Sequence, residues 1–135
     1  MNDLWAEDIV TETVRTPVAI LREQASLLGK KTQNVILAEV DSDVSREFKH
    51  NFNIKVPALG YYSYTLFTIT HSIELYPLKA YLDGEVAKEI GVDATENVFG
   101  VSIKDEADLL ELLAKILKAE RTKQIIRTLL AQSSE

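Results

Sequence analysis

The segment FKHNFNIKV (residues 48–56) alternates cleanly between large and polar side chains. Successive side chains of a β-strand point to opposite faces of the sheet, so this pattern predicts a strand with one buried and one wet face. Strands of this kind are typical of antiparallel sheets that are covered on one side only. The two series are Phe48, His50, Phe52, Ile54 and Val56 on one face, and Lys49, Asn51, Asn53 and Lys55 on the other.

A helix is predicted over residues 17–28, before this strand. Thr16 is a good N-cap residue, and Pro17 suits the first helical position. Gly29 suits the C′ position just past the end of a helix. Apolar residues recur at helical spacing, so one face should be buried. These residues are Val18, Leu21, Ala25 and Leu28.

Other segments rich in β-branched and aromatic residues predict further strands. Residues 41–43, Asp-Ser-Asp, are interpreted as the turn after the first of them. His71 is interpreted as a turn residue between two later strands, and Pro77 places the second of these at an edge or a bulge. The predicted strands are residues 34–40, 61–70, 73–82 and 97–103.

The remaining pattern is helical. A short helix is expected over 85–90, and an amphipathic helix follows the N-cap candidate Asp105. Its apolar stripe is interrupted by charged residues, so we expect a kink or a second helix near 119–122. Residues 2–15 are ambiguous. The chain therefore predicts an α+β fold in the order α-β-β-β-β-α-β-α-α, a mainly antiparallel sheet of about five strands with helices packed on one face, and a single domain over 1–135.

Composition excludes several functions. The chain has no cysteine, which rules out disulfides, thiolate metal sites and cysteine nucleophiles. It has 15 basic and 21 acidic residues, a net charge of −6, which argues against nucleic acid as a partner. No apolar run is long enough to span a bilayer and the first residues do not resemble a secretory signal, so we expect a soluble cytoplasmic protein without a membrane partner.

Few residues suggest chemistry. His71 has no metal-ligand neighbours at strand spacing, because residues 69 and 73 are both isoleucine, and it would meet His50 only if their strands pair. Residues 41–43 do not begin an EF-hand loop, because Arg46 stands where that loop needs glycine. Glu39 interrupts an apolar strand and is interpreted as solvent-facing, the alternative being a partly buried carboxylate. No metal or cofactor is expected.

Tyrosines are the most unusual local feature, because phenol rings are common both in protein interfaces and along small pockets. Ordinary cross-strand packing is the simpler interpretation. The last helix has a large apolar stripe that packs on the sheet or on a partner. The tyrosines are Tyr61, Tyr62, Tyr64, Tyr76 and Tyr81, and the stripe of the last helix is Ile125, Ile126, Leu129 and Leu130.

Two functions remain in view. The small size, the acidic balance and the lack of a recognisable catalytic constellation favour a non-catalytic protein–protein interaction module, such as a regulatory protein, an adaptor or an immunity-type inhibitor. Its partner would be another protein or a second copy of this chain. The interface would be formed by Tyr61, Tyr76, Tyr81, Ile126, Leu129 and Leu130. The alternative is a small-ligand-binding protein or enzyme with a pocket between sheet and helices, formed by Glu39, His50, His71, Tyr62 and Tyr64. Convergence of these groups around a cavity would distinguish the two.

Overall fold

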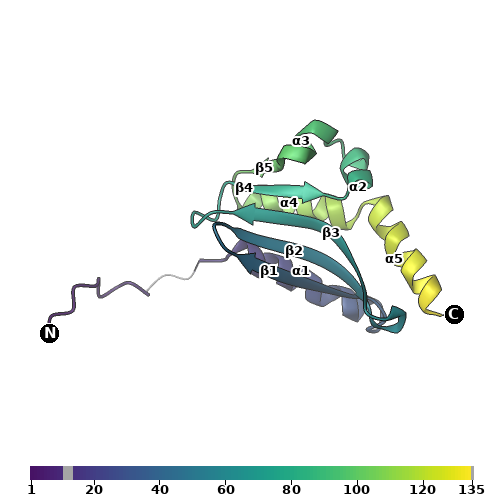
Figure 1. The fold of residues 1–135 in the computed structure, drawn as a ribbon, viewed down its shortest axis with the longest axis horizontal. Coiled ribbons are helices and arrows are strands. Elements are labelled where there is room, and N and C mark those ends of the chain that lie inside the picture. Colours follow the sequence, from purple (N-terminus) through teal and green to yellow (C-terminus); the bar gives the residue numbers. More distant parts are fainter. Residues whose placement is uncertain (11–13, 135) are drawn as a thin grey trace.

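The computed structural model describes residues 1–10 and 14–134, and it contains a five-stranded antiparallel sheet with helices around it (Figure 1). The strands follow one another in space as they do in sequence, so the sheet is a meander. In chain order the elements are α1 (Pro17–Lys31), β1 (Leu37–Val44), β2 (Phe48–Val56), the 3₁₀ turn η1 (Pro57–Leu59), β3 (Tyr62–His71), β4 (Leu78–Leu82), α2 (Gly84–Glu89), α3 (Ala94–Phe99), β5 (Val101–Ile103), α4 (Glu106–Leu117) and α5 (Glu120–Ser133).

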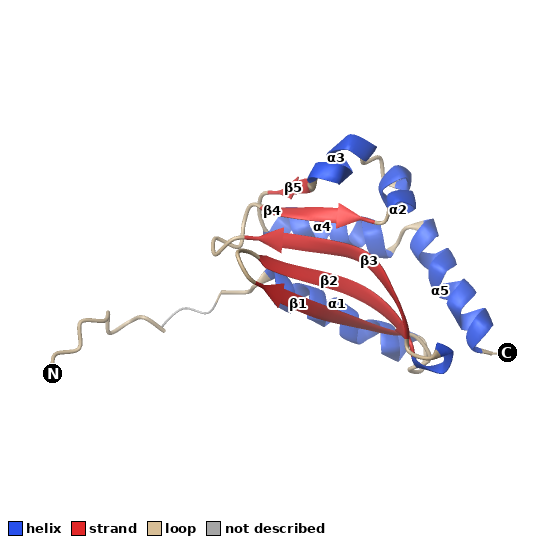
Figure 2. Cartoon of the chain, in the orientation of Figure 1, coloured by secondary structure: helices blue, strands red, loops and turns tan. Residues whose placement is uncertain are grey.

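The helices are not distributed evenly around the sheet. Helices α1 and α4 lie behind it in Figure 2, while α2 and α3 lie beyond β4 and β5, and α5 stands at the side. The face toward the viewer carries no helix among the described elements. The α+β fold, its antiparallel sheet and its one covered face are therefore confirmed.

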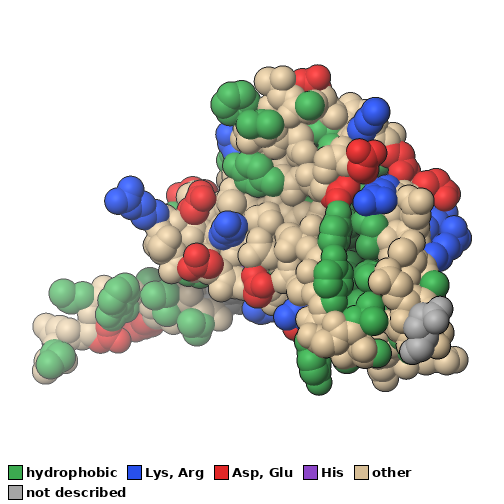
Figure 3. All heavy atoms as spheres, turned by 45° about the vertical axis from the view of Figure 1, so that its right-hand side comes forward, with side chains coloured by type: hydrophobic (Ala, Val, Ile, Leu, Met, Phe, Trp, Pro, Cys, Tyr) green, Lys and Arg blue, Asp and Glu red, His purple; other side chains and the backbone are tan. Residues whose placement is uncertain are grey.

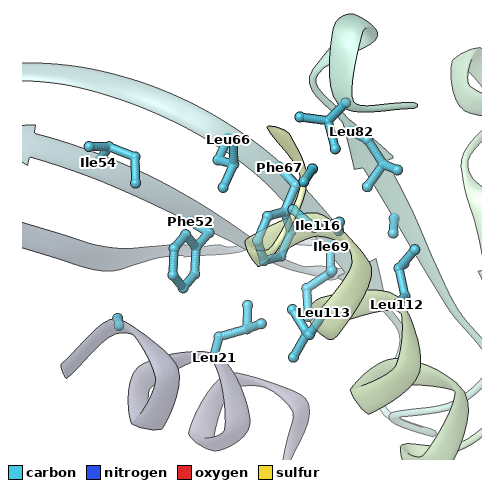
Figure 4. Close-up of a cluster of buried hydrophobic side chains, with 14 of the residues drawn as sticks. Leu21, Phe52, Ile54, Leu66, Phe67, Ile69, Leu82, Leu112, Leu113 and Ile116 are labelled. Carbon is cyan, nitrogen blue, oxygen red and sulfur yellow. The ribbon is translucent and has the colours of Figure 1, made fainter. Parts of the chain in front are cut away.

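The register of β2 explains how one face becomes the core. Phe52 pairs with Val40 of β1 and with Phe67 of β3, and its ring stacks on that of Phe67 with centroids 4.9 Å apart. The pairing then shifts by one residue, so Leu66 and Phe67 are both buried. Figure 4 shows side chains from the strands, α1 and α4 pointing toward one another, which makes this face the inside of a single core.

Helix α1 is longer than predicted, because Gly29 lies inside it and Thr32 is the C-cap. The glycine is needed there for close approach. A Cβ at this position would lie 2.9 Å from the side-chain oxygen of Asn34 and 3.1 Å from the side chain of Leu37. The returning chain crosses the helix at this point, and the backbone of Asn34 donates to the Gly29 carbonyl.

The predicted turn at residues 41–43 is wrong, since β1 continues to Val44 and the chain reverses over 45–47. Each of these residues pairs across the sheet with β2, and Asp41 accepts hydrogen bonds from the amides of Asn51 and Asn53, at 2.7 and 2.6 Å. Polar side chains with turn propensity are tolerated in this edge strand because the strand opposite offers them partners.

Two further predictions change. The segment 97–103 is not one strand. Residues 97–99 are the end of helix α3, and only Val101–Ile103 join the sheet. Residues 72–77 form a loop with a cis bond before Pro77, so the fourth strand is only Leu78–Leu82. The break between the last two helices is confirmed at residues 118–119. Residues 2–15, which the sequence left ambiguous, form no helix over 2–10 and 14–15. Residues 11–13 lie outside the described part of the chain.

Among the described residues, no helix combines the length and the apolar character needed to cross a membrane.

Candidate functional site

The two histidines meet inside the sheet. His50 of β2 and His71, the last residue of β3, have their Nε2 atoms 3.3 Å apart. The other ring nitrogen of His50 lies 2.7 Å from the hydroxyl of Ser42 on β1. The Nδ1 of His71 lies 2.7 Å from the carbonyl of Ser72. His71 is therefore a buried strand residue and not the turn residue that its sequence context suggested.

With both rings neutral, one set of proton positions satisfies this chain of hydrogen bonds. The Ser72 carbonyl can only accept, so His71 Nδ1 carries its hydrogen and the Nε2 of a neutral His71 is an acceptor. His50 must then donate from Nε2, and its Nδ1 accepts from the Ser42 hydroxyl. Burial, followed by the nearby His71 and then Arg22, lowers the pKa of His50 below its usual value. We call these atoms, which link β1, β2 and the end of β3, the histidine clasp.

The clasp is closed to solvent. The two residues are only 4% and 6% exposed, and Phe48 stacks on the His71 ring with centroids 5.1 Å apart. A substrate could not reach the rings unless this end of the sheet opened. No group of three or more potential metal ligands is found among the described residues.

The other predicted ligand-binding residues do not join the histidines. Glu39 faces solvent beside Lys55, with the carboxylate 3.5 Å from the ammonium, so its solvent-facing interpretation is confirmed. The Tyr64 hydroxyl donates to Asp83, and burial raises the pKa of this phenol. Tyr62 lies at the start of β3 and is exposed. Over residues 1–10 and 14–134, no hydrogen bond or ion pair joins these three groups to the histidine pair.

Nor do the tyrosines share one sheet surface. Tyr81 lies on the face opposite the core, paired with Thr68. Tyr76 lies in the loop before β4, and its hydroxyl is buried without a hydrogen-bond partner among the described residues. Tyr61 is 73% exposed at the turn that leads into β3. Dispersed rings of this kind do not define an aromatic interface.

The last helix packs back on the molecule. Ile125 and Leu129 are buried, while Ile126 and Leu130 are half-buried against the core. Figure 3 shows a strip of hydrophobic side chains on this side of the molecule, next to the C-terminal end. Glu89 of α2 accepts hydrogen bonds from the first two backbone amides of α5, at 2.7 and 2.9 Å. This carboxylate replaces the cap that the helix lacks in its own sequence.

A more distinctive surface is the groove between α1 and α4, on the helical side. Two hollows of about 330 and 250 Å³ adjoin there, because both are lined by Gln24, Leu117 and Lys118. Phe52, Ile54 and Leu66 form the floor of the larger one, and Figure 4 shows them on the strands, on the side that faces the helices. We name this surface the α1–α4 groove. Its other lining residues are Leu27, Leu28, Lys31, Leu110, Leu113, Ala114, Thr122 and Ile126.

The groove is apolar inside and basic at its edge. Leu27 is 39% exposed and Leu110 is 40% exposed, so their side chains are available to a partner. Lys31 lies at the C-terminal end of α1, and Lys118 caps the C-terminal end of α4. Neither ammonium forms an ion pair within residues 1–10 and 14–134. An occupant with apolar and acidic side chains would match this surface.

Sequence reasoning missed the groove. Leu28 and Ile126 were assigned to the apolar stripes of two different helices, Phe52 and Ile54 were assigned to a strand face, and only Ile126 was named as an interface residue. The weak signal was the stripe of α1, because Leu27 and Leu28 are adjacent leucines that cannot both point fully into one core.

No protein-family model, no curated protein and no solved structure matches the chain.

Proposed function

We propose that this protein is a non-catalytic protein–protein interaction module that holds an apolar segment of its partner in the α1–α4 groove. The observation that carries the proposal is the groove itself: core side chains form its floor, exposed leucines form its walls, and unpaired lysines stand at its edge. Grooves between helices bind partners through a few apolar side chains that enter them, as amphipathic helices do in many complexes.

The composition of the groove favours a protein partner over a substrate. Its charged lining residues are the ammonium groups of Lys31 and Lys118, which stand at its edge. General acid–base chemistry needs titratable groups that converge on the reacting atoms. The imidazoles that do converge, His50 and His71, are buried in their own clasp. Regulatory proteins, adaptors and immunity-type inhibitors act by binding another protein.

Recovery of the partner tests the proposal when it is compared between matched variants. Leu27→Glu places a charge in the groove at a side chain that is already 39% exposed, so the fold should tolerate it. Val98→Glu makes the same kind of change on α3, where the side chain is 73% exposed and lies outside the groove. The tagged full-length chains would be expressed in the native host together with a second, differently tagged copy, crosslinked and recovered.

We expect the unmodified chain and Val98→Glu to retain one protein near stoichiometry, and Leu27→Glu to lose it. A partner retained equally by both variants would show that the groove is not the binding surface. Recovery of the bait alone from all three chains would contradict the interaction function and favour the small-ligand alternative.

A further inference from the structure

The described part of the N-terminal segment has large apolar side chains that are exposed to solvent. Leu4, Trp5 and Ile9 are 93%, 76% and 61% exposed, and Val10 is exposed as well. This part of the chain leads away from the sheet and helices (Figure 1). Apolar side chains gathered in one exposed segment are typical of an interaction site, whereas single exposed residues are not.

The same segment is strongly acidic. Residues 1–14 contain four carboxylates and no lysine or arginine, while the remaining 121 residues have 17 acidic and 15 basic residues. Most of the net charge of the chain therefore lies in this short segment. Figure 3 shows red and green side chains side by side along it.

The segment and the α1–α4 groove are complementary. One has exposed apolar side chains between carboxylates, and the other has an apolar interior between unpaired ammonium groups. Opposite charges around an apolar contact favour association and fix its direction. A tryptophan ring contributes a large apolar area for few rotatable bonds, which suits it to the centre of such a contact.

The start of α1 favours a second copy over the segment's own groove. Arg15 is held at the surface by Glu23, at 2.8 Å, and by Glu106 of α4, at 3.6 Å. Lys31 stands at the opposite end of α1, about 22 Å away for 15 residues at 1.5 Å each. A segment that begins at Arg15 would have to reverse and follow the whole helix to bring its carboxylates to that end. A second molecule can approach the groove from outside without this reversal.

We propose that the N-terminal segment of one copy docks in the α1–α4 groove of a second copy, with Trp5 as its central side chain. The inference rests on the groove being a protein-binding surface, as proposed above, and it identifies the partner. Exchange in both directions gives a closed dimer with two identical contacts. The carboxylates of Asp3 and Glu7 then lie beside Lys31 and Lys118.

The chain offers its own probe, because Trp5 is its only tryptophan. Fluorescence of the full-length protein would be measured over a wide concentration range, together with its mass by sedimentation equilibrium. We expect the emission to shift to the blue as the concentration rises, in step with conversion from monomer to dimer. Trp5→Ala should remain monomeric in the same range.

Groove variants supply the controls. Leu27→Glu and Lys118→Glu should weaken dimerisation by about tenfold or more, because each alters the proposed contact. Lys49→Glu makes the same charge change on the uncovered face of the sheet, and it should alter the dimer constant by less than about twofold.

The outcomes separate the two proposals. A blue-shifted emission from a chain whose sedimentation mass is that of a monomer would show docking in the same chain and overturn the exchange between copies. An unshifted emission at all concentrations would overturn docking of the segment altogether. If the groove-dependent recovery described above still succeeded, the interaction function would stand with a different partner; if it failed as well, both proposals would fall.

Discussion

The histidine clasp makes a sharp prediction about stability, because its two members depend on each other. Replacement of His50 by leucine leaves the Nε2 of His71 buried without a donor, while the Ser42 hydroxyl at the other end is exposed and can bind water. Replacement of His71 leaves the Nε2 hydrogen of His50 buried without an acceptor, while the carbonyl of exposed Ser72 can bind water. Each single change therefore leaves one ring nitrogen unsatisfied.

The magnitude follows from the burial of these nitrogens. A buried polar atom without its partner costs about 1–3 kcal/mol, whereas replacing both partners by apolar groups of similar shape is close to neutral. We expect His50→Leu and His71→Leu each to lower the free energy of unfolding by about 1–3 kcal/mol. The double variant should be destabilised by clearly less than the sum, with a coupling energy of at least about 1 kcal/mol.

Urea unfolding followed by far-ultraviolet circular dichroism measures the free energy of unfolding of the unmodified chain, the two single variants and the double variant. The experiment belongs at pH 8, well above the pKa of about 6.5 that is usual for histidine. Equal slopes in urea would show that the variants unfold from the same compact state. If the two single effects simply add, within about 0.3–0.5 kcal/mol, the two rings do not share a hydrogen bond and the clasp is refuted.

Three further predictions concern pH, backbone and capping. Burial lowers the pKa of His50 in the folded chain, so the unfolded chain binds more protons and the free energy of unfolding should fall as pH drops below about 6.5; a double leucine variant that kept the same slope over pH 5–7 in urea titrations would contradict this. Gly100 has φ +93°, and a Cβ added there would lie 2.9 Å from the Tyr81 ring. Gly100→Ala should therefore lower the free energy of unfolding by about 1–3 kcal/mol, which a lower melting temperature would show. Gly84→Ala is the control, because a Cβ at this position meets no atom within 4 Å, and it should leave the melting temperature unchanged. Glu89→Ala removes the acceptor for two amides of α5 and should cost about 0.5–2 kcal/mol, with faster amide exchange at the start of that helix; unchanged exchange there would show that the cap contributes nothing.

How far the sequence could go is clear from particular segments. The alternation in β2 predicted its two faces correctly, and the apolar stripe of α4 predicted that helix, because both patterns are local and repeat over many residues. The turn at residues 41–43 was wrong because turn propensity is a weak local preference, and the amides of Asn51 and Asn53 across the sheet overrode it. The strand expected over 97–103 was wrong at its start for a different reason: these residues end α3, whose Asp93 cap lies outside the apolar run.

Less of the candidate site than of the fold could be predicted from the sequence. His50 and His71 were both noticed, but their contact depends on the register between β2 and β3, which one sequence does not specify. The groove depends on the distance between α1 and α4, and the residue pattern of one helix does not specify how far it lies from another helix. Glu89 capping α5 from α2 is a contact across 31 residues, and no motif in either helix marks it.

Side-chain type and local period were enough to predict most of the elements, the buried faces of β2 and α4, and the chemistries that a chain without cysteine cannot perform. Only the tertiary structure decided which polar groups meet and where apolar side chains stay uncovered. The histidine clasp, the helix cap from Glu89 and the α1–α4 groove all depend on the relative placement of elements distant in sequence. That placement comes from packing of the whole core, in which each contact depends on all the others.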